Sequence, residues 1–368
     1  MQDLYKVLNN DERAVYSLRA LYKDYGYTQY KMSKFEEYDL YVKNKEFLVS
    51  DSVITFTDTD GKLMALKPDV TLSIIKSNKD LKSGVKKVFY NENVYRVSKG
   101  TRAFKEIMQV GLECQGDIDE YTVTEVLLLA VKSLESISEN YVLDISHLGL
   151  VSAVIDELNL SNEGKKKILS CLGEKNAEGV LAVCKDESVD ENSAKILSSL
   201  TSLYGTPNKI ISAIKGMKLS ARAKVALTEL EDIVLELNRL GALKNVNVDF
   251  SVVNDMGYYN GIVFKGFING IPTSVLSGGQ YDLLMKKMGI NKGAIGFAVY
   301  LDALGKLNEE KNDFDVNTIV LYSEKTKLSA VSDAVEREKK LGASVLAVTI
   351  LPDKLKYAKV IDLSKGEN

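Results

Sequence analysis

Two long apolar runs of strand character, residues 85–97 and 105–118, are joined by the short polar loop 98–104. The segment that follows, 121–137, has apolar residues at the spacing of a helix. A hairpin signal lies upstream, where apolar runs flank the turn sequence Asp58-Thr59-Asp60-Gly61. These patterns predict that the strands form an antiparallel sheet, beginning with the upstream hairpin, and that a helix follows them.

The helical period occurs at two further places. Residues 11–25 predict an amphipathic helix that ends at Gly26, and the stretch from about 150 to 245 has the spacing of several helices. The β pattern then returns, with Asn269-Gly270 as a turn. We therefore predict that a helical insert interrupts the sheet, which is completed after it.

The length of 368 residues favours more than one domain. A charged segment, 308–314, precedes a tail in which two apolar runs flank a helical stretch near 325–341. That order is typical of a small βαβ unit. We expect one domain over 1–307, containing the insert of about 150–245, and a short C-terminal α/β segment over 315–368.

Charge and composition restrict the classes of function. The 48 basic and 51 acidic residues leave a formal charge of −3, which gives no overall attraction to a phosphate backbone. No segment approaches the roughly 20 apolar residues of a membrane span. Three scattered cysteines indicate no disulfide framework, and the first residues lack the pattern of a signal peptide. We expect a soluble, cytoplasmic protein.

The single histidine, His147, restricts the chemistry further. It excludes a His-rich metal site, and it excludes any Ser-His or Cys-His nucleophile system that is not built on this one residue. Much hydrolytic chemistry is thereby ruled out.

Polar side chains occur at two points in the first β region. In Lys67-Pro68-Asp69-Val70-Thr71, a carboxylate and a hydroxyl precede an apolar segment, although a helix N-cap explains the same residues. Gln109, Gly111 and Glu113 share one face of a strand, and Arg96 lies near the end of the preceding strand. Glu113 is either a buried charge that needs a partner or an exposed edge residue.

Two further segments stand out in the second β region. Tyr258 and Tyr259 precede an apolar run and are either ligand contacts or ordinary sheet aromatics. In the segment SGGQYD, residues 277–282, two glycines let the backbone approach a ligand closely or form a simple turn.

In this order, the segments resemble the catalytic domain of class II aminoacyl-tRNA synthetases, and specifically histidyl-tRNA synthetases. VFYNENVYR and KEIMQVGLE resemble the motif 2 hairpin, and LKPDVT resembles the strand end before it. YYNGIVF and SGGQYDLLMKKMG resemble the two histidine-specific signatures, and GAIGFAVYLDAL occupies the place of motif 3. The resemblance covers about residues 5 to 305. It implies an α+β fold in which a class II synthetase-like antiparallel sheet is flanked by helices.

Other positions depart from the synthetase pattern. Ser98 stands in place of an acid, and Ala303 stands in place of an arginine that lies along the ATP phosphates. Asn254 replaces an arginine that stabilises charge during adenylation, and losing such a group costs on the order of 3 kcal/mol of transition-state stabilisation. Ser33 stands at the motif 1 proline, and the tail is about half of an anticodon-binding domain. We therefore expect neither adenylation nor tRNA recognition.

The positions that hold the amino acid in this family are retained. The resemblance implies that Asp69 and Thr71 meet the α-ammonium group, Arg96 the carboxylate and Glu113 the imidazole. A zwitterion needs an acid and a base at one end, and the imidazole nitrogens need an acceptor at the other. The predicted histidine-binding residues are Asp69, Thr71, Arg96, Gln109, Glu113, Tyr258, Tyr259 and Tyr281.

Retained amino-acid contacts with lost ATP contacts resemble the ATP phosphoribosyltransferase regulatory subunits, a family of synthetase paralogues. That resemblance implies a protein that binds histidine, activates a short-form catalytic subunit at the first step of histidine biosynthesis and conveys feedback inhibition. It implies self-association through the synthetase-like dimer interface. It implies no catalytic residue, metal or cofactor in this chain, and no tRNA or membrane partner. The alternatives are another synthetase-like amino-acid-sensing or modifying paralogue, or an active histidyl-tRNA synthetase.

Overall fold

The computed structural model describes residues 8–45, 48, 53–78, 83–97, 103–253, 258–306 and 314–365. The chain forms two compact units, Met1–Leu307 and Asn308–Asn368. Among the described helices, none combines the length and apolarity needed to cross a membrane.

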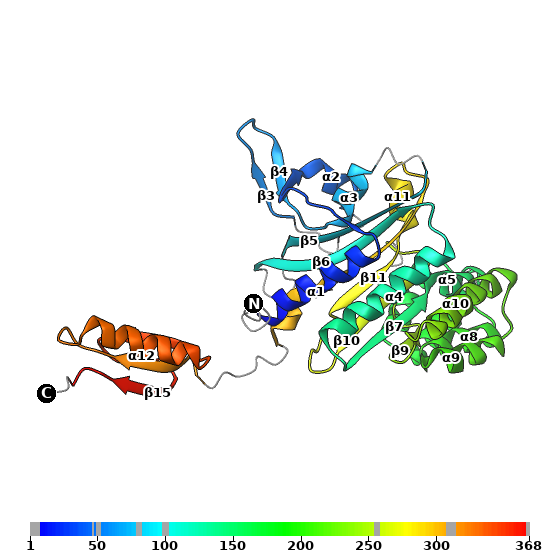
Figure 1. Cartoon of the computed structure of the whole chain (residues 1–368). Helices are drawn as coiled ribbons and strands as arrows, with labels where there is room; N and C mark the ends of the chain where they lie inside the picture. The colour runs from blue at the N-terminus through cyan, green and yellow to red at the C-terminus, as the bar shows by residue number, and fades with distance from the viewer. Residues whose placement is uncertain are drawn as a thin grey trace. The chain divides into compact units, whose positions relative to one another are not determined.

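A nine-stranded sheet forms the centre of the first unit (Figure 1). Its longest part is the antiparallel hairpin of β5 and β6, which forms where the two apolar runs were predicted. In spatial order, the strands are β1 (Thr28–Gln29), β5 (Val85–Val97), β6 (Phe104–Gly116), β12 (Gly293–Tyr300), β11 (Leu276–Gln280), β10 (Ile262–Ile268), β7 (Tyr141–His147), β9 (Val246–Asp249) and β8 (Tyr204–Gly205).

The sheet is mixed, whereas an antiparallel sheet was predicted. β1 pairs with β5, and β7 with β9, in parallel orientation, while the other pairs are antiparallel. Parallel neighbours need a long crossover connection. The helical insert between β7 and β9 supplies that connection, so the insert itself makes the second parallel pair possible.

The upstream hairpin forms a separate small sheet, and the prediction that it begins the main sheet is wrong. Gly61 has the positive φ of +80° that this turn requires. The hairpin strands pair with each other and with one further short strand instead of with the main sheet. Ala65 of β4 packs in one apolar cluster with helices α2 (Tyr38–Lys43) and α3 (Thr71–Ser77). In spatial order, the strands are β2 (Phe35–Glu37), β4 (Leu63–Leu66) and β3 (Thr55–Thr57).

Helices α1 (Asn10–Asp24) and α4 (Glu120–Ile137) lie side by side on one face of the main sheet (Figure 1). A capping box of Asn9 and Glu12 begins α1, and the Asp119 side chain caps α4. Both helices pack their apolar faces onto the main core. The β6 residues that belong to this core alternate along the strand: Val110, Leu112 and Cys114.

The insert consists of six helices and the short edge strand β8, and its helices lie beside β9 (Figure 1). Its buried residues, such as Leu172, Leu197 and Leu230, belong to the same core as the sheet, so the insert has no separate core. The helices are α5 (Leu148–Asp156), α6 (Asn162–Gly173), α7 (Ala177–Asp186), α8 (Glu191–Leu200), α9 (Pro207–Lys215) and α10 (Ala221–Arg239).

The single histidine joins the insert to the sheet. His147 ends β7, and its Nδ1 accepts the backbone N–H of Leu150 at 3.2 Å, which caps α5. Its Nε2 then donates to Glu229 Oε2 of α10 at 3.0 Å. Both ring nitrogens are therefore engaged in structural bonds.

The second unit is a parallel three-stranded sheet of order β14-β13-β15 with one helix. The predicted strand-helix-strand order is present, and β15 is an additional strand. Its residues are mostly exposed, so it lacks the continuous apolar run by which the other strands were predicted. The elements are β13 (Val316–Leu321), α12 (Leu328–Lys340), β14 (Val345–Val348) and β15 (Tyr357–Asp362).

Candidate functional site

The candidate site lies on the face of β6 opposite to the main core. Gln109 and Glu113 are buried there, each only 3% exposed, with Gly111 between them. The two-residue period of a strand predicted that these residues share one face, and the structure confirms this prediction. β6 is an interior strand between β5 and β12, so the alternative of an exposed edge residue is wrong for Glu113.

A second apolar cluster covers this face. Helices α3 and α11 (Asp282–Lys287) each supply two of its buried residues, and Tyr281 lies at the junction of β11 and α11. The cluster holds the N-terminus of α3 and the Tyr281 ring against the sheet. Its fully packed members include Tyr41, Leu72, Ile75, Tyr281, Leu284 and Met285.

Glu113 is buried, and its carboxyl oxygens accept hydrogen bonds from two hydroxyl groups. Thr71 Oγ1 donates to Glu113 Oε1 at 2.8 Å, and the Tyr281 hydroxyl donates to Oε2 at 2.5 Å. Burial raises the pKa of Glu113 to about 8, the two hydroxyl donors lower it and the neighbouring Asp69 raises it. Within the part of the chain that the structure describes, no lysine or arginine forms an ion pair with this carboxylate.

Gly296 of β12 makes the space for the Glu113 side chain. The two residues lie opposite each other in the β6–β12 ladder. A Cβ on Gly296 would lie 1.9 Å from Glu113 Oε2 and 2.5 Å from the carbonyl oxygen of Leu112. A side chain at this position therefore excludes the observed carboxylate position.

We predict that Gly296→Ala destabilises the fold by about 1 to 3 kcal/mol, as overpacking does, because the Leu112 backbone cannot move aside cheaply. The free energy of urea unfolding measures this effect. Gly305→Ala is the control, because a Cβ there would meet no atom within 4 Å. Equal unfolding free energies for the two variants would contradict the prediction.

Asp69 and Arg96 lie together beside this network. Asp69 Oδ1 accepts the backbone N–H of Leu72 at 2.9 Å, so the residue does cap α3, as the alternative interpretation held. Burial raises the pKa of the Asp69 carboxyl, while the Leu72 N–H and the Arg96 guanidinium lower it. Arg96 Nε donates to the carbonyl oxygen of Pro68 at 2.9 Å. The Asp69 carboxylate is thus fixed by the Leu72 N–H, and the Arg96 guanidinium is fixed by the carbonyl of the residue before Asp69.

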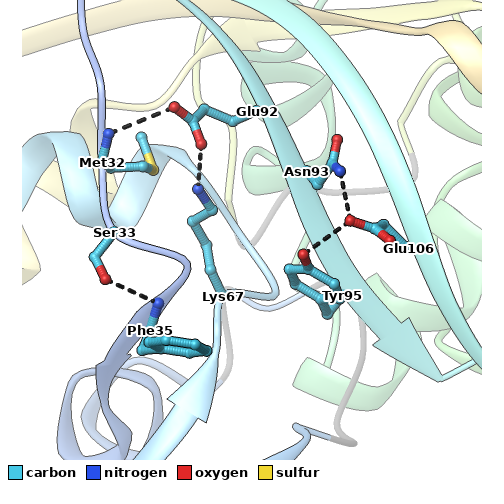
Figure 2. Close-up of polar contacts among 8 residues, drawn as sticks. All are labelled: Met32, Ser33, Phe35, Lys67, Glu92, Asn93, Tyr95 and Glu106. Atoms are coloured by element: carbon cyan, nitrogen blue, oxygen red, sulfur yellow. Dashed lines mark hydrogen bonds and ion pairs between the residues drawn. The ribbon is translucent and has the colours of Figure 1, made fainter.

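A buried ion pair fixes the chain just before Asp69 (Figure 2). Lys67 is 0% exposed, and its Nζ lies 2.8 Å from Glu92 Oε2. The other Glu92 oxygen accepts the N–H of Met32 at 3.4 Å, and the Lys67 carbonyl accepts the N–H of Tyr95 at 2.8 Å. The pair therefore ties three separate segments to one point.

Ser33, the residue at the motif 1 proline position, lies next to this pair (Figure 2). Its Oγ accepts the backbone N–H of Phe35 at 3.1 Å. A proline has no hydroxyl and cannot make this bond. The segment that leads into β2 is therefore held by a side-chain contact that a proline at this position could not make.

The three predicted tyrosines gather at the other side of Glu113. The rings of Tyr258 and Tyr281 have centroids 5.8 Å apart, and those of Tyr258 and Tyr259 are 4.6 Å apart. Burial raises the pKa of Tyr258 well above its usual value. A Cβ on Gly279 would lie 2.8 Å from the Tyr259 ring, so this glycine admits the ring. Residues 277–280 belong to β11, so the simple-turn alternative is wrong.

Seven of the eight predicted residues are thus linked to one another by hydrogen bonds, ring contacts or electrostatic interactions. Gln109 lies on the same buried face, but its side chain is not joined to Glu113 by a hydrogen bond among the described residues. Sequence reasoning missed Gln115, Asn78 and Gly296. Gln115 could have been found, because it continues the period-two series through Gln109 and Glu113. Asn78 and Gly296 offered no signal of their own.

Of the four residues that depart from the synthetase pattern, Ser33 and Ala303 lie among the described residues. Ala303 lies in the 3₁₀ helix η3 (Leu301–Lys306) and packs against the main core. Ser98 and Asn254 lie outside the described residues. No group of three His, Cys, Asp or Glu side chains arranged to hold a metal ion occurs in the described ranges.

A family model described as histidyl-tRNA synthetase matches residues 4–304. The chain belongs to the histidyl-tRNA synthetase family. Two curated relatives of this chain are each named ATP phosphoribosyltransferase regulatory subunit. The relative from Alkaliphilus metalliredigens is 26% identical over 339 residues, covering 89% of this chain and 85% of the relative. The one from Clostridium kluyveri is 28% identical over 340 residues, covering 89% and 87%. The predicted resemblance to these regulatory subunits is confirmed.

Solved structures of the histidyl-tRNA synthetase family and its relatives share the fold. The ATP phosphoribosyltransferase regulatory subunit/histidyl-tRNA synthetase from Bacillus halodurans has a TM-score of 0.75 and 24% identity, covering 98% of this chain and 95% of that one. An ATP phosphoribosyl transferase (HisG:HisZ) complex from Thermotoga maritima has a TM-score of 0.62 and 19% identity, covering 78% and 96%. The predicted class II synthetase-like fold is therefore confirmed.

Proposed function

We propose that this chain is a regulatory subunit of ATP phosphoribosyltransferase that binds histidine at the Glu113 network. One observation carries the proposal: among the described residues, a buried carboxylate accepts hydrogen bonds from two hydroxyl groups and forms no ion pair, while the Arg96 guanidinium acts electrostatically on the neighbouring Asp69. Such a site suits a zwitterion whose side chain presents an N–H group. The names of the curated relatives and the solved two-component complex support the regulatory role.

Each end of a bound histidine has its own partners in this proposal. Asp69 and Thr71 receive the α-ammonium group, and Arg96 pairs with the α-carboxylate. Glu113 accepts the imidazole N–H, and Tyr281 holds Glu113 in place. Gln109, Tyr258 and Tyr259 complete the surroundings of the ligand. The sole histidine of the chain is engaged at α5 and does not compete for this site.

The role that we propose is non-catalytic. The Ala303 methyl group packs on the core, and the resemblance to the synthetases implies that they carry, at this position, a cation along the ATP phosphates. We infer that the chain activates a short-form catalytic subunit and conveys inhibition by histidine, associates with itself through the synthetase-like dimer interface, and binds no tRNA. Its family includes active synthetases, so an active histidyl-tRNA synthetase remains the second candidate.

An exchange assay separates these two candidates. We expect no histidine-dependent exchange of pyrophosphate into ATP, because Ala303 cannot neutralise a triphosphate. We expect the same preparation to co-purify with a short-form phosphoribosyltransferase, raise its activity, and make that activity sensitive to histidine. Exchange above the level of a no-histidine control would establish the synthetase instead. Histidine binding without either activity would point to another amino-acid-sensing paralogue.

A further inference from the structure

A continuous row of hydrogen bonds connects the partly exposed Lys86 to the buried Glu113. Lys86 Nζ donates to Asn78 Oδ1, and Asn78 Nδ2 donates to Gln115 Oε1 at 2.7 Å. Gln115 Nε2 donates to the Tyr281 hydroxyl oxygen at 3.2 Å, and that hydroxyl donates to Glu113 Oε2 at 2.5 Å. The row passes through four parts of the fold: β5, the end of α3, β6 and the junction of β11 and α11.

The direction of every bond in this row is determined by its Lys86 end. An ammonium group can only donate, so Asn78 accepts through Oδ1 and donates through Nδ2, and Gln115 does the same in turn. If the Asn78 or Gln115 amide were reversed, donors would face donors and acceptors would face acceptors. The Tyr281 hydroxyl therefore accepts from Gln115 and must direct its proton at Glu113.

Burial makes this row sensitive to interruption. Asn78, Gln115 and Tyr281 are all at most 4% exposed, so water does not readily replace a missing partner. In such surroundings, consecutive hydrogen bonds polarise one another in the same direction. The positive end at Lys86 thus favours negative charge at the far end, on Glu113.

Among the other titratable groups around Glu113, Asp69 acts on its pKa in the opposite sense, whereas the Tyr281 hydroxyl lowers that pKa as part of the row. Asp69 at the start of α3 raises the pKa of Glu113 through its negative charge. The phenols that face the carboxylate, Tyr90 of β5, Tyr258 and Tyr281, carry no positive charge. Across the described ranges, Lys86 is the cation that a row of hydrogen bonds links to Glu113.

We propose that Lys86, Asn78 and Gln115 are positioning residues that hold Tyr281 as a donor to Glu113 and keep this carboxylate as an acceptor for the ligand. The site then selects ligands that present an N–H group, such as imidazole or ammonium, and disfavours ligands that present a second acceptor. The identity of the ligand rests on the proposed function, whereas the row of hydrogen bonds does not.

The ligand-free full-length chain, labelled with ¹³C at the glutamate carboxyl carbon, allows a direct test by NMR. The Glu113 signal is assigned by its loss in Glu113→Gln. We expect Lys86→Met and Gln115→Met to shift the pH midpoint of this signal upward by about 0.5 to 1 pH unit, with Lys86→Arg restoring the midpoint. Lys292→Met is the matched control, because Lys292 pairs with Asp117 near the Gln115 end of β6 but is not in the row.

Calorimetric titration with histidine gives the second readout. We expect the dissociation constant to rise about three- to tenfold in Lys86→Met and to stay unchanged in Lys292→Met. Equal pH midpoints for Glu113 in these two variants would overturn the proposal. Failure of the wild-type chain to bind histidine would instead overturn the proposed function, because the carboxyl titration is measured without a ligand.

Discussion

Replacing Glu113 with glutamine is expected to weaken histidine binding by about 10- to 150-fold. A hydrogen bond to a charged group contributes about 1.5 to 3 kcal/mol, and glutamine keeps the size of the side chain but loses the charge. Calorimetric titration at pH 8 with the isolated chain measures the change. Feedback inhibition of the assembled enzyme should require correspondingly more histidine, while activation of the catalytic subunit should persist.

Glu106→Gln is the matched control for this experiment. Glu106 lies on the same strand, but it is fully exposed and contacts Asn93 and Tyr95 (Figure 2). The variant removes one carboxylate from β6 without touching the buried network. An unchanged histidine affinity in Glu113→Gln, with the assembly intact, would mean that another residue contacts the imidazole.

The same carboxyl group should make the stability of the ligand-free protein depend on pH. Burial raises the pKa of Glu113 from 4.5 to about 8, so the folded chain keeps a proton that the unfolded chain releases between these values. Stability from this group is complete below about pH 4.5 and is lost as the pH rises through 8. The loss amounts to about 3 to 5 kcal/mol in the free energy of unfolding.

Urea unfolding at several pH values between 5 and 9, for the wild type and for Glu113→Gln, measures this contribution. Glutamine does not titrate, so the stability difference between the two proteins isolates the effect of Glu113. We expect the wild type to lose stability relative to the variant with rising pH. A difference that stays constant over this range would show that Glu113 has an ordinary pKa in the folded chain.

Thermodynamic linkage should connect the affinity for histidine to the feedback inhibition of the assembled enzyme. If histidine favours a less active assembly, the substrates that favour the active assembly must weaken histidine binding by the same factor. Because the proposed pocket contains Glu113, a variant with altered affinity should change the concentration at which feedback occurs and not the maximum activity. This relation connects the binding titration to the kinetics of the complex.

The local elements of the fold followed from sequence patterns. The apolar alternation over 85–97 and 105–118 predicted the β5–β6 hairpin, and the same period placed Gln109, Gly111 and Glu113 on one face. These predictions depend on neighbours along one strand, where a period of two is a geometric necessity. The order of the polar segments was sufficient to indicate the family.

Tertiary structure decided what those segments do to one another. Thr71 and Tyr281 reach Glu113 from 42 and 168 positions away, so the choice between a buried and an exposed Glu113 depended on helices that no local pattern places there. Gly296 and the row from Lys86 likewise belong to strands that meet only in the folded sheet. The sequence by itself therefore determined the strands, their faces and the family. Only the packing of α3, α11 and β12 onto β6 decided the burial of Glu113 and its pKa, because burial is set by contacts between distant segments.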